Sequence, residues 1–394
     1  MDKETFVERY YVERRNTQSV KWDQMDEMFH QQDLLPLWIA DMDFKVSEAI
    51  TEALAKRLEH GVFGYTYAPD SYYLAYQAWL KDHFNYEVAR EWLRFTPGVV
   101  QALFNLLNCY TQKGDAVVIL TPVYYPFADS VRNTGRRLVP VDLINQQGDF
   151  TIDFEQFETA VVASEAKVYI HCSPHNPVGR VWTKAEQAQL FEICAKHNVI
   201  IISDEIHQDF TFGEHQHIPA AKVAQGRYSD RIITANSASK SFNIAGLTHS
   251  TLIISDEALR EQYDTYALST IATEFNMMGM LATEAAFAGG HDWLTGLKHL
   301  ILANYQTAKQ RLNETLPEVN ISPLEGTYLL FLDLNPILKG HDIADFMQNR
   351  CGIAVDYGEW FGEGYQGYIR INLATKPELV DQAVETIIRE AKML

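Results

Sequence analysis

Five short apolar segments alternate with amphipathic stretches through the middle of this chain of 394 residues. They occupy residues 116–120, 167–171, 199–203, 231–235 and 250–254. Each segment is apolar at nearly every position, as strands are when helices cover both faces of a parallel sheet. The alternation therefore predicts an α/β fold with a mainly parallel sheet.

Helix signals lie between and after these segments. Thr183 and Glu186 form a capping-box pattern that opens a helix running to about residue 197, and Ser47 is a candidate N-cap for a helix that ends at Gly61. After about residue 290 the pattern changes to a helix over 291–316, a strand over 328–333, a helix near 341–350, short strands around 353 and 368, and a last helix opened by Pro377. We predict an N-terminal segment, 1–46, that joins a small α+β domain, 291–394, beside a large domain, 47–290.

The composition of the chain excludes several classes of function. A formal net charge of −19 argues against nucleic acid or an anionic membrane as partner, because those partners bind basic patches. No apolar run is long enough to span a membrane, and the N-terminus has no signal-peptide pattern. The four cysteines are scattered without paired spacing, as is typical of reduced thiols. We therefore expect a cytoplasmic globular protein.

Lys240 follows the apolar segment 231–235 and has a serine on each side. An isolated lysine is usually a solvated surface residue, so its position alone favours a structural role. Burial, however, lowers the pKa of a lysine amine and turns it into a nucleophile that condenses with carbonyl groups. Lys240 is therefore a candidate catalytic residue.

Acidic and imidazole side chains follow the apolar segment 199–203. The carboxyl ends of parallel strands border the ligand crevice of α/β proteins, so Asp204 is expected near Lys240. A carboxylate there either keeps a heterocyclic nitrogen protonated or caps a helix. A metal site formed by Asp204, Glu205, His207 and Asp209 is a third interpretation. Against it, the adjacent Asp204 and Glu205 would face opposite ways in an extended chain.

Four further segments place polar or aromatic residues at turns and strand ends. Asn176 is bracketed by two prolines, which would hold its amide rigidly for a hydrogen bond to a ligand. Gly98 opens a helix whose free N–H groups suit a phosphate, and Tyr124 lies between prolines where its ring suits a flat ligand. Arg370 alternates with apolar residues in a strand and suits a carboxylate. Taken singly, each also fits a plain turn, core packing or a surface ion pair.

The order of these features resembles the class I/II aminotransferase superfamily, the fold-type I enzymes that use pyridoxal 5′-phosphate. The resemblance covers nearly the whole chain. It is closer still to the cystathionine β-lyase, or C–S lyase, branch of the maltose-regulon-modulator type, whose markers are segments 36–44, 175–182, 204–207 and 239–246. It implies a large domain with a mainly parallel seven-stranded sheet covered by helices, and a smaller α+β domain.

The resemblance also implies how the cofactor is held. Lys240 would bind the cofactor's aldehyde and later move the substrate's α-proton, and Asp204 would keep the pyridine nitrogen protonated. Tyr124 would stack on the ring, and Asn176 would bond its phenolic oxygen, near which His207 replaces the tyrosine of many aminotransferases. The residues implied around the phosphate are Gly98, Val99, Val100, Ser237 and Ser239. The tyrosine that reaches the phosphate of a neighbouring subunit would be Tyr65, which implies a homodimer.

The implied substrate is a small amino acid. Arg370 would bind its α-carboxylate, with Asn176 and the backbone of Ala40 nearby. Thr248 stands eight residues after the lysine, where aminotransferases usually place an arginine, and this favours the lyase branch. We therefore expect α,β-elimination of L-cystathionine or related cysteine S-conjugates to thiol, pyruvate and ammonia. An aminotransferase of an aromatic or neutral amino acid, and a cofactor-bound regulatory protein that acts through partner binding, are the alternatives; no metal is expected.

Overall fold

A mixed seven-stranded sheet forms the centre of the computed structural model, which describes residues 1–272 and 275–394. Its strand order is β2-β10-β9-β8-β7-β3-β4. The strands are β2 (Leu93–Thr96), β3 (Ala116–Thr121), β4 (Arg137–Asp142), β7 (Val168–Cys172), β8 (Ile200–Asp204), β9 (Ile232–Asn236) and β10 (Ser250–Ile254). Neighbours from β9 to β4 are parallel, whereas β10 is antiparallel to β9 and β2. The predicted mainly parallel seven-stranded sheet is confirmed.

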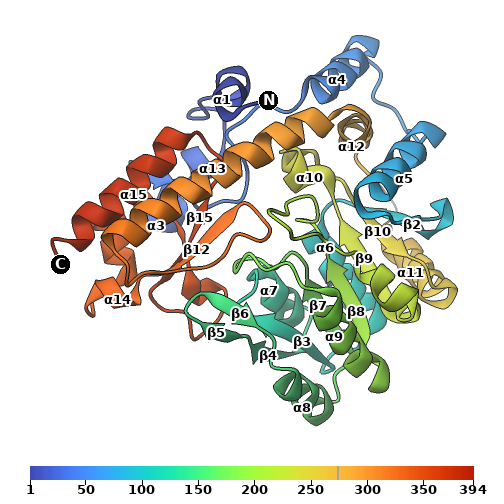
Figure 1. Cartoon of the computed structure of the whole chain (residues 1–394). Helices are drawn as coiled ribbons and strands as arrows, with labels where there is room; N and C mark the ends of the chain where they lie inside the picture. The colour runs from blue at the N-terminus through green and yellow to red at the C-terminus, as the bar shows by residue number, and fades with distance from the viewer. Residues whose placement is uncertain (273–274) are drawn as a thin grey trace.

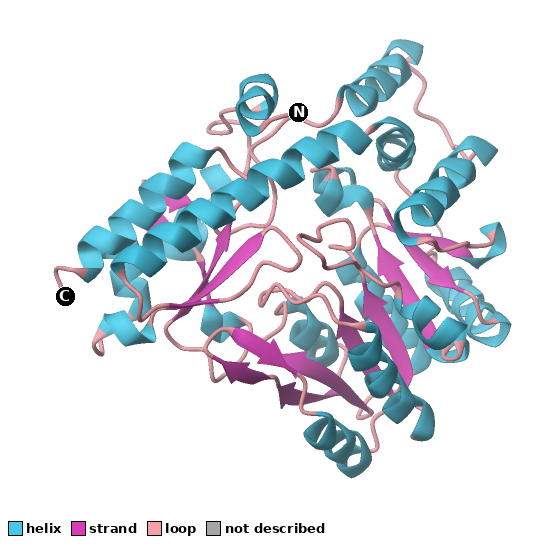
Figure 2. Ribbon diagram, in the orientation of Figure 1, coloured by secondary structure: helices cyan, strands magenta, loops and turns pink. Residues whose placement is uncertain are grey.

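Helices cover both faces of this sheet, which explains why its strands are apolar throughout (Figures 1 and 2). On β3, Val117 and Ile119 pack on one face with α6 (Val99–Tyr110), α7 (Pro126–Asn133) and α11 (Glu257–Thr270). Val118 and Leu120 pack on the other face with α8 (Phe154–Ser164) and α9 (Lys184–Lys196). The alternation of the strand side chains therefore builds two separate cores.

A smaller antiparallel sheet, in the order β11-β12-β15-β14, forms a second layer. Its strands are β11 (Asn320–Ile321), β12 (Leu329–Asp333), β14 (Asp356–Tyr357) and β15 (Tyr368–Asn372). The long helices α13 (His291–Thr315) and α15 (Pro377–Ala391) run beside it (Figure 1). Strand β1 (Leu35–Pro36) pairs in parallel with β13 (Ile353–Ala354), so the N-terminal segment joins this layer. The domain limits at residues 46 and 290 stay a prediction.

The predicted helix ends are mostly confirmed. The Thr183 hydroxyl and the Glu186 carboxylate form the capping box of α9, and α4 (Glu48–His60) ends at Gly61 in the left-handed conformation, at φ 71°. The Ser47 side chain, by contrast, makes no capping bond. The helix expected near 341–350 is shorter and wider, with a π-helical stretch over Asp345–Arg350.

The remaining α-helices and strands flank or connect these layers. They are α1 (Lys3–Tyr10), α2 (Val20–Asp23), α3 (Met25–Phe29), α5 (Asp70–Phe84), α10 (Ala238–Ser241), α12 (Met277–Gly289), α14 (Asn335–Leu338), β5 (Ile144–Gln146) and β6 (Asp149–Thr151). None of the described helices combines the length and apolar character that crossing a membrane requires.

A buried ion pair fixes the N-terminal segment against the two layers. Lys21 Nζ donates to Asp43 Oδ2 at 2.9 Å, and both side chains are fully buried. Asn243, three residues after Lys240, donates through Nδ2 to the carbonyls of Met42 and Phe44. These hydrogen bonds join residues 42–44 both to the buried ion pair and to the segment that follows Lys240. Residues 39 and 40, which border the candidate site, are thereby positioned.

Candidate functional site

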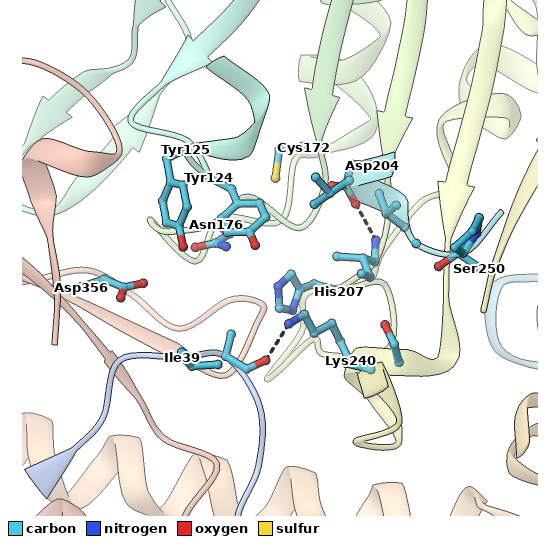
Figure 3. A pocket seen from close by; sticks show the side chains of 18 of the residues that line it. Ile39, Tyr124, Tyr125, Cys172, Asn176, Asp204, His207, Lys240, Ser250 and Asp356 are labelled. Atoms are coloured by element: carbon cyan, nitrogen blue, oxygen red, sulfur yellow. Dashed lines mark hydrogen bonds between the residues drawn. The ribbon is translucent and has the colours of Figure 1, made fainter. Parts of the chain in front are cut away.

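The side chains singled out in the sequence meet around one cavity of about 350 Å³ between the two layers (Figure 3). The cavity opens at the carboxyl ends of β7 and β8, as expected for a doubly covered parallel sheet. The predicted residues that line it are Ala40, Gly98, Val99, Val100, Tyr124, Asn176, Asp204, His207, Ser239, Lys240 and Arg370. Ser237 and Tyr65 do not line it.

Lys240 projects into this cavity from the short helix α10 (Figure 3). Its Nζ donates a hydrogen bond of 2.6 Å to the carbonyl oxygen of Ala40. Enclosure by protein lowers the pKa of this amine to about 8, although the nearby Asp41 and Asp204 carboxylates oppose the change. A substantial fraction of the Lys240 amine is therefore uncharged near neutral pH, as a nucleophile or a base requires.

Asp204 ends β8 and presents its carboxylate to the cavity. It accepts a hydrogen bond of 3.0 Å from the Ile206 N–H, and burial raises the pKa of its carboxyl to about 7. A protonated heterocycle nitrogen beside it would favour the ionised form.

Glu205 faces away from the cavity, as the alternation along the strand predicts. It accepts hydrogen bonds from the Ser203 hydroxyl, His217 Nε2 and the Ala220 N–H. In residues 1–272 and 275–394, no group of three or more His, Cys, Asp or Glu side chains has the arrangement of a metal site.

Asn176 and Arg370 contact each other at the end of the cavity that lies away from Asp204. Arg370 Nη1 donates to Asn176 Oδ1 at 3.0 Å, and Nη2 donates to the Trp38 carbonyl at 3.1 Å. The guanidinium lies 5.0 Å from the centre of the Phe361 ring. Arg370 is 2% exposed, so the alternative of an ion pair at the strand surface is wrong, and its buried guanidinium suits a carboxylate.

Tyr124 and His207 line the cavity between these two ends. The backbone N–H of Tyr124 donates a hydrogen bond of 3.1 Å to the backbone carbonyl of Asn176. This bond holds together the two loops that carry these residues. His207 packs edge-on against Tyr328, at 5.4 Å between ring centres, and burial holds the pKa of its imidazole well below the usual range. His207 is therefore a neutral group that can donate or accept a hydrogen bond.

The end of the cavity near α6 carries no cationic side chain among the described residues that line it. The helix begins after Gly98, so its first N–H groups are free for an anion. Ser239 contributes from α10, whereas the Ser237 hydroxyl donates to the His249 carbonyl at 2.7 Å. Thr248 is exposed, and its hydroxyl accepts a hydrogen bond from Asn276. Burial lowers the pKa of the neighbouring His249 imidazole to about 4, so it is neutral.

Tyr65 lies outside the cavity and is fully exposed. It belongs to a segment with several exposed apolar side chains, namely Leu58, Val62, Phe63, Tyr65 and Tyr67. Its contribution to a phosphate site within a dimer stays a prediction.

Several residues at the cavity had no role predicted from the sequence, and four of them bear on its chemistry. Tyr125, His249 and Asp356 line the cavity, and Tyr328 donates a hydrogen bond of 2.8 Å to the Ala40 carbonyl that Lys240 also uses. Tyr125 follows Tyr124 directly. The sequence therefore shows both tyrosines, but only Tyr124 had a predicted role. No pattern in the sequence marks Asp356 as a site residue, because its strand has only two residues.

The chemistry of the lining residues fits pyridoxal phosphate. The cavity combines three features: the Lys240 amine with its lowered pKa, the buried Asp204 carboxylate at the carboxyl end of β8, and the N-terminus of α6, which suits a phosphate. His207 Nδ1 is buried and has no hydrogen-bond partner within the described residues. The donor set is therefore matched to a flat, anionic aldehyde rather than to a metal ion.

Comparison with known proteins supports this fit. The family model for class I and II aminotransferases matches residues 32–387. The cystathionine beta-lyase PatB of Bacillus subtilis is 37% identical over 91% of this chain and 93% of its own length, and the protein MalY of Escherichia coli is 32% identical over 96% of both. The structure of cystalysin from Treponema denticola, which contains a pyridoxal 5′-phosphate cofactor, superposes with a TM-score of 0.92 at 34% identity, over 97% of this chain and 98% of that one.

Proposed function

Because this chain belongs to the class I and II aminotransferases, we propose that it is a pyridoxal-phosphate-dependent C–S lyase. Its substrates are L-cystathionine or related cysteine S-conjugates, which it splits into a thiol, pyruvate and ammonia. One observation carries the proposal: Lys240, Asp204 and Arg370 converge on one cavity. The names of the similar proteins, a cystathionine beta-lyase and cystalysin, support elimination over transamination.

Three side chains would hold the cofactor and substrate. When bound, the cofactor supplies an electron-withdrawing ring that stabilises negative charge at the substrate's α-carbon. Asp204 would keep a proton on the ring nitrogen through a charge-assisted hydrogen bond. Arg370 would hold the α-carboxylate, and the Tyr124 ring would restrict the tilt of the flat group.

Lys240 would then act as general base. Its neutral amine removes the proton from the α-carbon, and the electrons of that C–H bond form a double bond to the β-carbon as the C–S bond breaks. Sulfur leaves with the electron pair of the C–S bond and takes up one proton as thiol. Hydrolysis of the resulting enamine by one water molecule gives pyruvate and ammonia.

An assay without any 2-oxo acid separates this function from its alternatives. Purified, cofactor-loaded protein fed L-cystathionine should release thiol and pyruvate in equal amounts. An aminotransferase would instead convert its cofactor to the aminated form once and stop, because it needs an oxo acid acceptor. A purely regulatory protein would give neither result.

The rate of covalent cofactor attachment should depend on pH. Only the neutral amine of Lys240 attacks the aldehyde, and its pKa is about 8. The rate should therefore rise about tenfold per pH unit below this value and level off above it. Mixing cofactor-free protein with pyridoxal phosphate, from about pH 6 to about pH 9, and following visible absorbance measures this profile.

Asp41 provides an internal control for that profile. Its negative charge raises the pKa of Lys240, so Asp41→Asn should move the midpoint to lower pH. A rate that stays constant across the whole pH range would contradict the role of Lys240.

We also propose a homodimer in which Tyr65 contacts the cofactor phosphate of the other subunit. The exposed apolar side chains in the segment around Tyr65 support this interface, because exposed apolar side chains that gather in one region mark contact sites. Among the described residues that line the cavity near the N-terminus of α6, none carries a cationic side chain. A phosphate bound there would need a further hydrogen-bond donor, which the other subunit could supply.

Removing the Tyr65 hydroxyl should weaken cofactor binding. Since a hydrogen bond to a charged group contributes about 1.5–3 kcal/mol, Tyr65→Phe should raise the dissociation constant of pyridoxal phosphate roughly tenfold to a hundredfold. Titration of cofactor-free protein by fluorescence measures this constant. Tyr67→Phe changes an exposed tyrosine two residues away and should leave it unchanged. Equal constants for wild type and Tyr65→Phe would remove Tyr65 from the site.

The cysteines support a cytoplasmic location, which we propose. All four are free thiols, and Cys172, Cys194 and Cys351 are buried. Burial raises the pKa of the half-buried Cys109 thiol to about 12, so this side chain stays protonated. Such thiols suit a reducing compartment.

A further inference from the structure

Arg370 has a second carboxylate partner, Asp356, that belongs to the protein itself. Strand β14 runs antiparallel to β15, and Asp356 stands directly opposite Arg370. Opposed residues of antiparallel strands project from the same face, so the register of the sheet creates this pair. Arg370 Nη2 donates to Asp356 Oδ2, and the two side chains are only 2% and 3% exposed.

This pair limits what Arg370 can offer a substrate. A guanidinium has five N–H groups. Both N–H groups of Nη2 are engaged, by Asp356 and by the Trp38 carbonyl, and Nη1 already bonds Asn176. Nε is buried and has no partner in the described residues. A substrate carboxylate that binds Arg370 therefore shares the guanidinium with Asp356.

The sharing leaves an excess negative charge at this end of the cavity. Two carboxylates beside one guanidinium disfavour each other's ionisation. Burial already raises the pKa of Asp356 to about 6, despite the opposing charges of Arg370 and Lys240. A positive group near Asp356 would relieve the excess charge, and a further negative group would increase it.

The Asp356 carboxylate lines the cavity that the substrate would enter. Figure 3 shows it pointing into the cavity near Tyr125, at the end opposite Ser250. Burial and the nearby Asp356 charge raise the pKa of the Tyr125 hydroxyl, which stays a neutral donor. Among the described lining residues, Lys240 and Arg370 are the cations, and both are committed to the reacting end of the substrate. When the substrate's α-carboxylate shares Arg370, the charge of Asp356 is no longer fully balanced, and a sulfur substituent that extends toward Asp356 would meet this negative charge.

We propose that Asp356 determines substrate specificity: the enzyme prefers cysteine S-conjugates with a cationic substituent on sulfur and disfavours those with an anionic one. This inference rests on the proposed function and deepens it by naming the charge class of the substrate. Asp356 does not take part in the bond changes; it selects the molecules that Arg370 and Lys240 receive.

Three conjugates of similar size test the proposal. They are S-(2-aminoethyl)-L-cysteine, which is cationic, S-propyl-L-cysteine, which is neutral, and S-carboxymethyl-L-cysteine, which is anionic. In the wild-type enzyme kcat/KM should fall in that order, by about tenfold or more from first to last, as expected for partly desolvated charge pairs. Asp356→Asn should bring the three values close together. Glu359→Gln removes an exposed carboxylate three residues away and should keep the wild-type order.

Binding without reaction gives an independent measurement. Analogues without any primary amine, 3-(2-(trimethylammonio)ethylthio)propanoate and its uncharged counterpart 3-(3,3-dimethylbutylthio)propanoate, cannot condense with the cofactor. Calorimetry on the cofactor-loaded wild type should show tighter binding of the cationic analogue, and Asp356→Asn should remove the difference. This order supports the proposal even if no conjugate yields pyruvate, a result that would overturn only the lyase function.

Several outcomes would overturn the inference. Equal wild-type affinities for the two analogues would do so without any variant. An Asp356→Asn enzyme that keeps the wild-type ratios would show that the carboxylate does not select charge. A uniform loss for all ligands would make Asp356 a support for Arg370, and a uniform gain would make it a competitor for the substrate carboxylate.

Discussion

Replacing Lys240 with alanine is expected to lower the turnover of cysteine S-conjugates by about 10³-fold or more. The amine both attaches the cofactor and removes the α-proton in the proposed mechanism, and proton transfer by a positioned group alone contributes about 10²–10⁴-fold. The variant should also lose the visible absorbance of the covalently attached cofactor. Pyruvate release and the absorbance spectrum measure the two effects on the same sample.

Lys298 offers a matched control for this experiment. It lies on α13, away from the cavity, and burial lowers the pKa of its amine as well. Lys298→Ala should retain the absorbance and the turnover, because a lowered pKa without the neighbouring Asp204 and Arg370 gives no chemistry. A Lys240→Ala protein that keeps the covalent absorbance would show that another amine holds the cofactor.

The sequence predicted Lys240 and Asp204 because each stands at or soon after the end of an apolar strand of the central sheet. Parallel strands end at the same edge, so the positions of two strand ends in the chain predict that their next residues meet. The capping box of α9 was equally readable, since its hydrogen bonds join residues only three apart. In these places local pattern and tertiary structure agree.

Other parts of the site depend on contacts that a local pattern does not encode. Asp356 meets Arg370 only through the register of β14 and β15, and β14 is two residues long. Tyr328 reaches Ala40 from a distant part of the chain. The Ser237 hydroxyl had a phosphate role implied, but it turns to the His249 carbonyl instead of lining the cavity. The register of a two-residue strand, a contact between distant parts of the chain and the orientation of one hydroxyl decide these three cases, and a local pattern in the sequence encodes none of them.

Breaking the pair of Arg370 and Asp356 should destabilise the fold as well as abolish activity. Arg370→Leu leaves the Asp356 carboxylate buried without its cation, and removing one partner of a buried pair costs about 3–5 kcal/mol. The double variant Arg370→Leu, Asp356→Leu should recover most of that loss, because apolar replacement of both partners is close to neutral. Urea unfolding of cofactor-free protein measures both changes.

Activity should separate from stability in this pair of variants. The double variant is expected to fold and bind pyridoxal phosphate, since it leaves Lys240, Asp204 and the N-terminus of α6 unchanged. It should nevertheless fail to process any cysteine S-conjugate at measurable substrate concentrations, because the α-carboxylate has lost its guanidinium. A double variant that regains wild-type turnover together with its stability would show that Arg370 serves the fold alone, and the substrate carboxylate would then have to bind elsewhere in the cavity.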